Sequence, residues 1–179
     1  MKDNKTKTFT IIAGINGVGK SSFSGARELE NCIDVDKIAF ERGISNFEAG
    51  KIALKMVTDF LDKGLSFAQE TTLSGNNVFH TATKAKVLGY KVRLFYIGLD
   101  TVEESIIRID NRVRRGGHHI KTHDVLRRYE KRFVVLKKLL PICDEAVFLD
   151  NSNGFMIASE NNEWFRKGDF QHRTVIRPE

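Results

Sequence analysis

The stretch Gly14-Ile15-Asn16-Gly17-Val18-Gly19-Lys20-Ser21 decides the fold. It satisfies the pattern G-x-x-x-x-G-K-S/T at every fixed position, and a β-branched and aromatic run over residues 8–13 leads into it. Glycines let successive backbone N–H groups turn toward a phosphate, and a following helix points its positive N-terminal end at the same anion. The motif therefore predicts a buried strand, a phosphate-binding P-loop and a helix that begins at Lys20.

The contacts expected of this loop are with a nucleoside triphosphate. Lys20 would bridge the β- and γ-phosphates, and the hydroxyl of Ser21 would hold Mg²⁺. The residues expected to bind ATP or GTP here are Gly14, Asn16, Gly17, Val18, Gly19, Lys20, Ser21 and Ser22. The alternative interpretation is a glycine-rich turn between strand and helix with an incidental lysine.

Apolar runs and amphipathic stretches alternate along most of the chain. The segments expected as strands are 8–13, 32–35, 66–70, 92–99 and 145–150, and those expected as helices are 20–29, 45–63, 77–88, 101–115 and 122–140. Ser45 with Glu48, and Thr101 with Glu104, have capping-box spacing. The alternation predicts an α/β P-loop NTPase or kinase fold, with a five-stranded, mainly parallel sheet and helices on both faces. Residues 1–154 would form this domain, and residues 155–179 would extend it with a C-terminal β-hairpin.

The composition is that of one globular domain. Of 179 residues, 41% are hydrophobic and 29% are charged, which excludes a disordered chain, a collagen and a repeat array. The two cysteines, Cys32 and Cys143, match no C-x-x-C spacing, which indicates reduced thiols. Residues 1–7 are polar and lysine-rich, unlike a signal or transit peptide. We expect a cytoplasmic protein without a membrane partner.

The net charge of +6 is concentrated in one segment. Residues 108–138 hold eleven Lys and Arg against three acidic residues, a local charge of +8 that leaves −2 for the remainder. Within it, two basic helices flank Gly116 and Gly117. Such an arrangement is typical of an arginine-rich lid that closes over phosphates. The arginines considered for this lid are Arg108, Arg112, Arg115, Arg127 and Arg128. The alternative is a solvated face with helical pairs such as Arg108 with Glu104.

Carboxylates and hydroxyls follow the second and third expected strands. Because parallel strands end at one edge of a sheet, ligands are expected there. Asp36 could accept a proton from an acceptor hydroxyl, although either Asp36 or Asp34 could instead cap the next helix. The candidates for substrate binding in the next loop are Glu70, Thr72 and Ser74, and Glu70 could also contact Mg²⁺ through water. The alternative for this loop is a helix N-terminus rich in capping hydroxyls.

Taken in order, these segments resemble the zeta toxin family, and more closely its short, single-domain bacterial members. The resemblance spans about residues 8–154. Its specific segments are Glu-Thr-Thr-Leu-Ser-Gly at 70–75 and Arg-Val-Arg-Arg-Gly-Gly-His at 112–118, whereas the P-loop is generic. Asp36, the Arg-Arg-Tyr run at 127–129 and the Asp-Asn-Ser run at 150–152 complete the pattern.

This resemblance implies a P-loop kinase that transfers the γ-phosphoryl of ATP or GTP, with Mg²⁺, to a hydroxyl of a small molecule. UDP-N-acetylglucosamine is the substrate associated with the longer toxins, and an epsilon-type antitoxin would be a separate chain. The implied roles are phosphate lysine for Lys20, base for Asp36, substrate or magnesium contacts for Glu70 and Thr72, lid arginines for Arg112, Arg115 and Arg128, and a place beside the nucleotide base for Asn151. An Asx turn is the alternative for residues 150–152.

Three alternative functions remain for a basic P-loop protein. A polynucleotide 5′-hydroxyl kinase would account for the basic segment, but Tyr129 and Phe133 are four apart on an apolar helix face and belong to the core, so nucleic acid is not the expected partner. A metal site at His118, His119 and His123 lacks a cysteine or a further acidic ligand. A nucleotide-binding switch would need a guanine-reading Asn-Lys-x-Asp segment, which the sequence lacks.

Overall fold

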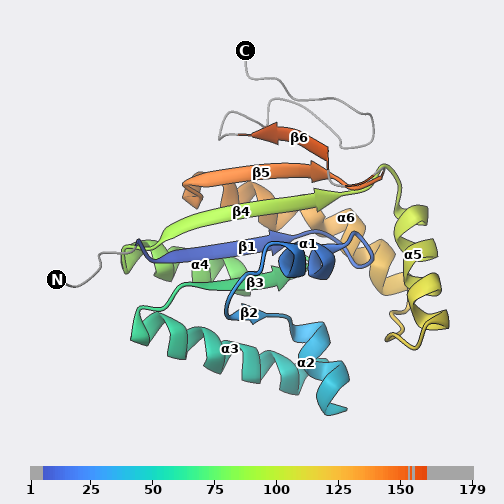
Figure 1. The fold of residues 1–179 in the computed structure, drawn as a ribbon, viewed down its shortest axis with the longest axis horizontal. Helices are drawn as coiled ribbons and strands as arrows, with labels where there is room; N and C mark the ends of the chain where they lie inside the picture. Colours follow the sequence, from blue (N-terminus) through green and yellow to red (C-terminus); the bar gives the residue numbers. More distant parts are fainter. Residues whose placement is uncertain (1–5, 153, 155, 161–179) are drawn as a thin grey trace.

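The structure, a computed structural model, describes residues 6–152, 154 and 156–160. One sheet runs through it, with the strand order β2-β3-β1-β4-β5-β6 (Figure 1). The strands are β1 (Thr8–Ala13), β2 (Cys32–Ile33), β3 (Phe67–Thr71), β4 (Lys91–Gly98), β5 (Glu145–Asp150) and β6 (Met156–Glu160). The first five are parallel to one another and β6 is antiparallel to β5, which confirms the predicted fold class.

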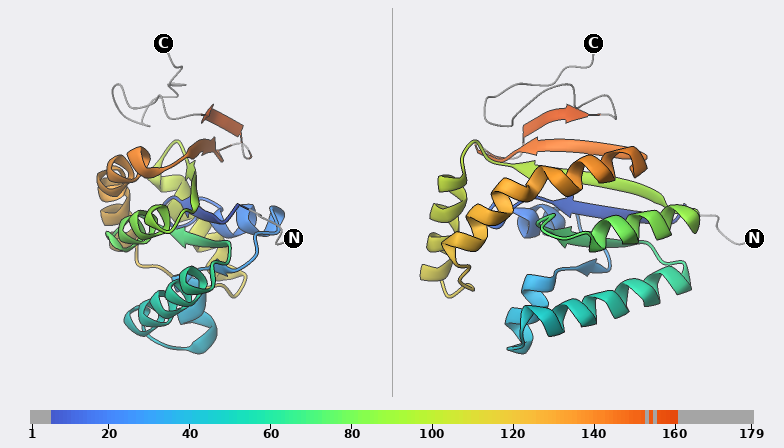
Figure 2. Two further views of the ribbon diagram at one scale, coloured as in Figure 1. Left: turned by 90° about the vertical axis from the view of Figure 1, so that its left-hand side faces the viewer. Right: turned by 180° about the vertical axis from the view of Figure 1, so that it is seen from behind.

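Helices cover both faces of this sheet. They are α1 (Lys20–Ala26), α2 (Val35–Arg42), α3 (Asn46–Lys63), α4 (Asn77–Val87), α5 (Val102–Arg114) and α6 (Thr122–Leu139), and the short 3₁₀ helix η1 (Leu140–Ile142) follows α6. Seen from behind, α4 and α6 lie across the sheet, whereas α1 lies on the opposite face and α5 stands beyond the carboxyl ends of the strands (Figures 1 and 2).

Alternation along the strands divides the core into two layers. Phe9 and Ile11 of β1 pack with buried residues of α3, α4 and α6, while Ile12, one residue on, packs on the other face with Phe23 of α1 and Ile109 of α5. Because strand side chains alternate between faces, central strands buried on both sides need continuous apolar runs. The sequence of β1 and β4 has this character.

The structure corrects two predicted boundaries and adds one helix. The helix expected over 20–29 ends at Ala26, because Glu28 and Asn31 adopt left-handed backbone conformations with φ of 49° and 54°. The strand expected over 32–35 ends at Ile33, and the helix α2, which was not predicted, follows it. Asp34 caps α2: its Oδ1 accepts hydrogen bonds from the backbone N–H groups of Asp36 and Lys37, at 3.0 and 3.2 Å.

Other local predictions are confirmed. The Ser45–Glu48 capping box is present, with Glu48 N donating to Ser45 Oγ at 3.2 Å and Ser45 N donating to Glu48 Oε2 at 3.0 Å. Strand β6 pairs with β5, whereas most of the segment predicted to form a C-terminal hairpin, residues 155 and 161–179, lies outside the described residues. In the described part of the chain, no helix is both long enough and apolar enough to cross a membrane.

Substitution of Leu136 by alanine should lower the free energy of unfolding by about 2–5 kcal/mol, because it leaves a cavity in the layer between α6 and the sheet. Leu136 is fully buried there. Urea denaturation measures the change. The matched control is Val134→Ala on the same helix, where the side chain is 58% exposed and the expected change is within about 0.5 kcal/mol. Equal effects of the two substitutions would contradict this packing.

Candidate functional site

The P-loop lies in close contact with β4 and α5. A Cβ on Gly14, at φ +146°, would lie 2.3 Å from the carbonyl oxygen of Ile97, and a Cβ on Gly17, at φ +82°, would lie 2.6 Å from that of Ser105. No side chain fits at such distances, and both backbone conformations favour glycine. The two glycines therefore let the loop lie directly against its neighbours, with α5 beside it.

Asn151 holds the P-loop from the side of β5. Its Nδ2 donates to the carbonyl oxygen of Val18 at 2.8 Å, and its own carbonyl oxygen accepts a hydrogen bond from Arg108 at 2.7 Å. The N–H of Ser152 donates to Asp150 Oδ1 at 2.8 Å, which is the Asx turn considered as an alternative. The side chain of Asn151, expected beside the nucleotide base, thus contacts the loop backbone.

Lys20 lies at the mouth of the loop among carboxylates. Its Nζ donates to the carbonyl oxygen of Ile15 at 3.0 Å. Burial lowers the pKa of Lys20, while the charges of Glu70 and Asp36 act in the opposite direction. The ammonium group of Lys20 lies where the P-loop, α2 and β3 meet.

Glu70 connects β3 to α1. One carboxylate oxygen accepts a hydrogen bond from Ser21 Oγ at 3.0 Å, and the other accepts one from Ser24 Oγ at 2.7 Å. Glu70 is only 7% exposed, and burial, with the charge of Asp34, raises its pKa. A hydroxyl and a carboxylate side by side are oxygen ligands of the kind Mg²⁺ uses together with substrate phosphates and water. Ser21 and Glu70 therefore fit a magnesium ion.

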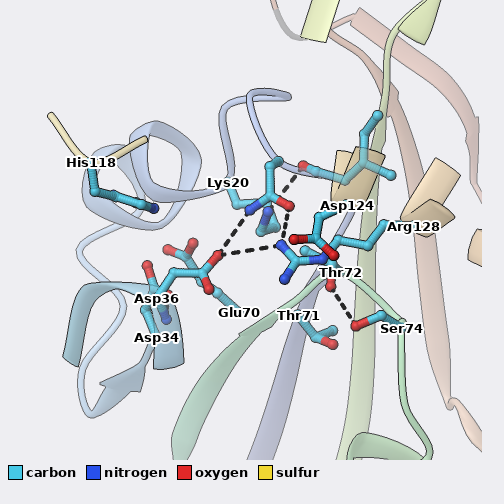
Figure 3. Close-up of polar contacts among 12 residues, drawn as sticks. Lys20, Asp34, Asp36, Glu70, Thr71, Thr72, Ser74, His118, Asp124 and Arg128 are labelled. Carbon is cyan, nitrogen blue, oxygen red and sulfur yellow. Dashed lines mark hydrogen bonds and ion pairs between the residues drawn. The ribbon is translucent and has the colours of Figure 1, made fainter. Parts of the chain in front are cut away.

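Asn16 joins Asp36 to Arg128. Its Nδ2 donates to Asp36 Oδ2 at 2.8 Å, and its Oδ1 accepts a hydrogen bond from Arg128 Nη1. The same guanidinium nitrogen lies 4.0 Å from Asp36 Oδ2, and the two side chains point toward each other (Figure 3). The side chains of Arg128 and Asp36 are 15% and 26% exposed, so this ion pair is partly shielded from solvent. Residues from the P-loop, α2 and α6 thus form one polar network.

The other arginines of the basic segment differ in where they point. Arg112 donates to the carbonyl oxygen of His118 at 3.0 Å, and burial lowers the pKa of Arg112. Arg115 is exposed and shares an outer hollow with Arg108 and Arg112. Arg127 turns away from the network and donates to Asp124 at 2.8 Å. Only part of the predicted lid therefore faces the P-loop.

Two cavities meet at the carboxyl edge of the sheet. The first, of about 250 Å³, lies along the P-loop and is named here the P-loop cavity; its lining includes Asn16, Gly17, Gly19, Lys20, Ser21, Ser22, Arg108, Arg112 and His118. The second, of about 230 Å³, is named the β3 cavity; its lining includes Asn46, Gln69, Thr71, Thr72, Ser74, Asn77 and Arg128. Lys20, Asp34, Asp36 and Glu70 line both cavities.

The loop after β3 is held in a fixed shape. Leu73 is buried in the core although its backbone is left-handed, at φ 55°. Its N–H donates to Thr71 Oγ1 at 3.0 Å, and the hydroxyls of Thr72 and Ser74 lie 3.0 Å apart. A buried leucine in this conformation needs support from its surroundings. Thr72 and Ser74 are thereby presented to the β3 cavity.

Most predicted site residues come together, and two further ones, Ser24 and Gln69, join them. Arg108, considered only as a lid arginine, instead contacts the backbone of Asn151. Ser24 lies three residues after Ser21 on α1, a spacing that places both on one helix face and could have indicated it. Gln69 is a polar residue inside an apolar strand, which is also a readable signal. The role of Arg108 depends on the position of β5, which sequence spacing does not give.

Replacing Glu70 with glutamine should change the pH dependence of thermal stability. The raised pKa means that the folded state holds a proton more strongly, so the contribution of Glu70 to stability is largest below its usual pKa of 4.5 and falls as pH rises through the raised value. The melting temperature of wild type minus that of Glu70→Gln should therefore fall as the pH rises above about 4.5.

The control for this experiment is Glu48→Gln. Hydrogen bonds from Ser45 lower the pKa of Glu48, so the corresponding difference should rise with pH. A difference for Glu70→Gln that is constant, or that rises with pH, would contradict the assignment of a buried carboxylate between two hydroxyls.

Comparison with known proteins gives one sequence relative and several structural ones. An uncharacterized protein of Haemophilus influenzae is 34% identical over 126 residues, which cover 66% of this chain and 90% of that protein. No protein-family model matches the chain.

Three solved structures have a similar fold. A chain of the AvrRxo1-ORF1:AvrRxo1-ORF2 complex with sulphate ions has a TM-score of 0.67 at 16% identity. The match covers 88% of the present chain and 59% of the AvrRxo1 chain. The same pair solved with ATP gives a TM-score of 0.62 at 14% identity over the same shares. The PezAT chromosomal toxin-antitoxin system of Streptococcus pneumoniae gives a TM-score of 0.63 at 19% identity, over 89% of this chain and 73% of the other. The chain therefore shares the P-loop α/β fold of the AvrRxo1 and PezAT structures, and it belongs to the same family as the Haemophilus influenzae protein.

Proposed function

We propose that the protein is a kinase that transfers the γ-phosphoryl group of ATP or GTP to a hydroxyl of a small molecule. One observation carries the proposal: the P-loop cavity and the β3 cavity share the wall formed by Lys20, Asp34, Asp36 and Glu70. A nucleotide in the P-loop cavity and an acceptor in the β3 cavity would be adjacent at this wall, which carries one cation and three carboxylates. Enzymes catalyse phosphoryl transfer mainly by positioning the two substrates and stabilising charge, with little covalent chemistry from the protein.

The donor side would hold the nucleotide phosphates. The P-loop backbone and Lys20 would bind them, and Ser21 with Glu70 would hold Mg²⁺, which supplies charge neutralisation on the phosphate oxygens. The structure of AvrRxo1-ORF1:-ORF2 with ATP, which has this fold, supports a nucleotide as donor. Arg112 lines the same cavity and would add positive charge as the lid residue expected from the sequence.

The acceptor side would position and deprotonate a hydroxyl. Its oxygen forms a bond to the γ-phosphorus as the bond from that phosphorus to the β,γ-bridging oxygen breaks, the hydroxyl proton passes to Asp36, and the nucleoside diphosphate leaves. The network with Asn16 and Arg128 supports Asp36 as the base, because it holds the carboxylate at the shared wall. Thr72 and Ser74 would bind the acceptor.

The finer assignments follow the resemblance. We infer a UDP-N-acetyl amino sugar as the acceptor to test first, and a separate antitoxin chain as the protein partner. PezAT is described as a toxin-antitoxin system, which supports the partner. We further infer that the protein acts in the cytoplasm, where ATP and nucleotide sugars are made.

Mass spectrometry of reaction products tests the proposed function. The protein would be incubated with Mg²⁺ and ATP or GTP against UDP-sugars, other small hydroxyl compounds and 5′-hydroxyl oligonucleotides. A phosphorylated small molecule is the expected product. A phosphorylated oligonucleotide would instead indicate a polynucleotide kinase, and slow release of phosphate alone would indicate a nucleotide-binding switch; either outcome would contradict the proposal. Phe133 packs against Tyr96, with ring centroids 6.3 Å apart, so it does not favour a stacking platform.

Substitution of Asp36 by asparagine should lower kcat about 10²- to 10⁴-fold, because the acceptor hydroxyl loses its base. Nucleotide affinity should stay near that of wild type, since the amide keeps the size of the side chain and one oxygen for the hydrogen bond from Asn16. Product formation and nucleotide titration measure the two quantities. Full transfer by this variant would exclude Asp36 as the base.

Substitution of Arg128 by alanine should lower kcat about 10³-fold, because positive charge beside the transferred group is lost. Arg127→Ala is the matched control: the neighbouring arginine pairs with Asp124 and should leave kcat within about twofold of wild type. The account is wrong if the two variants have equal kcat, or if Arg127→Ala has the larger defect.

A further inference from the structure

Gln69 is a buried polar residue in the otherwise apolar layer between the sheet and the helices α3 and α4. It is the third residue of β3, and its register partners are Ile11 of β1 and Ile33 of β2. Both partners are fully buried members of one apolar cluster, and residues paired across a sheet face the same side. A glutamine therefore occupies a position whose immediate neighbours are aliphatic.

The amide oxygen of Gln69 lacks a partner. Gln69 is 9% exposed, and its Oε1 is buried and forms no hydrogen bond with any residue that the structure describes. A buried acceptor without a hydrogen bond destabilises the folded state, so its presence needs a functional explanation. Gln69 lines the β3 cavity, which supplies a place for a hydrogen-bond donor to approach.

The lining of the β3 cavity has two kinds of chemistry. Its charged residues are Lys20, Asp34, Asp36, Glu70 and Arg128; four of them form the wall shared with the P-loop cavity, and Arg128 contacts Asp36. The rest of its polar lining consists of carboxamides and hydroxyls, from Asn46, Gln69, Thr71, Thr72, Ser74 and Asn77. Groups of this kind recognise neutral donors and acceptors, whereas a phosphate or carboxylate calls for cations.

We propose that Gln69 accepts a hydrogen bond from a neutral polyhydroxylated ring in the β3 cavity and so selects the acceptor. The inference deepens the proposed function and rests on it for the claim that the bound compound is phosphorylated. The ring hydroxyl that reacts lies at the shared wall, and a hydroxyl or amide N–H elsewhere on the ring donates to Gln69 Oε1. The ring is recognised in this way whether it is a free sugar or one carried on a nucleoside diphosphate.

The test compares Gln69→Leu with wild type in two measurements. The first is thermal stabilisation by hexoses and N-acetylhexosamines, each offered free and as its UDP conjugate, without nucleotide donor. The second is steady-state kinetics with the compound that is phosphorylated. Leucine keeps much of the size of glutamine but cannot accept a hydrogen bond.

The expected result separates binding from folding. Gln69→Leu should weaken binding of the ring and raise its KM about tenfold, with the KM for ATP unchanged and a melting temperature equal to or above that of wild type. The matched control is Thr10→Val on β1, whose register partner is Ala68, so it faces the opposite side of the sheet and should leave both KM values unchanged.

Several results would overturn the inference. Equal ring affinity of wild type and Gln69→Leu would exclude this contact, and a lower melting temperature with unchanged affinity would show a purely structural role. Binding of none of the ring compounds to wild type would exclude the ligand class. A different result would show that the proposed function fails while this inference holds. The ring compounds would then bind to wild type and not to Gln69→Leu, but wild type would form no phosphorylated product.

Discussion

The side chain of Asn16 is the contact on which the geometry of the site depends. It is 3% exposed, and each end of its carboxamide is used: the nitrogen donates to Asp36 and the oxygen accepts from Arg128. The three residues come from the P-loop, from α2 and from α6, the last 112 positions away along the chain. A buried amide with both ends paired fixes orientation as well as distance. The positions of Asp36, the P-loop and Arg128 are therefore fixed relative to one another.

The parallel sheet explains why these groups can meet. Lys20 and Asp36 lie just beyond the carboxyl ends of β1 and β2, Glu70 lies near that of β3, and α6 brings Arg128 to the same edge (Figures 1 and 3). Within β3, Glu70 hydrogen-bonds to α1 while Gln69 belongs to the layer under α4. One strand end thus contributes to both cavities, because Glu70 lines both of them and Gln69 lines the β3 cavity.

The sequence was most informative where the physical signal is local. The P-loop, the Ser45–Glu48 capping box and the apolar strands depend on a few neighbouring residues, and they were predicted closely. The helix α2 was missed because it has eight residues and a weakly amphipathic sequence. Arg127 and Arg128 look equivalent in the sequence, but the rotation of α6 turns one to Asp124 and the other to Asn16. Tertiary packing, which decides such differences, has no local signature.

The most direct test of the account is a crystal structure with ADP, aluminium fluoride and Mg²⁺, in which the fluoride complex takes the place of the transferred phosphoryl group. The account predicts the complex at the wall between the two cavities, within hydrogen-bond distance of Lys20 and Arg128, with Asp36 on the side opposite ADP. A complex bound away from this wall, or facing solvent with Asp36 still paired only to Asn16 and Arg128, would contradict the assignment of a kinase active site.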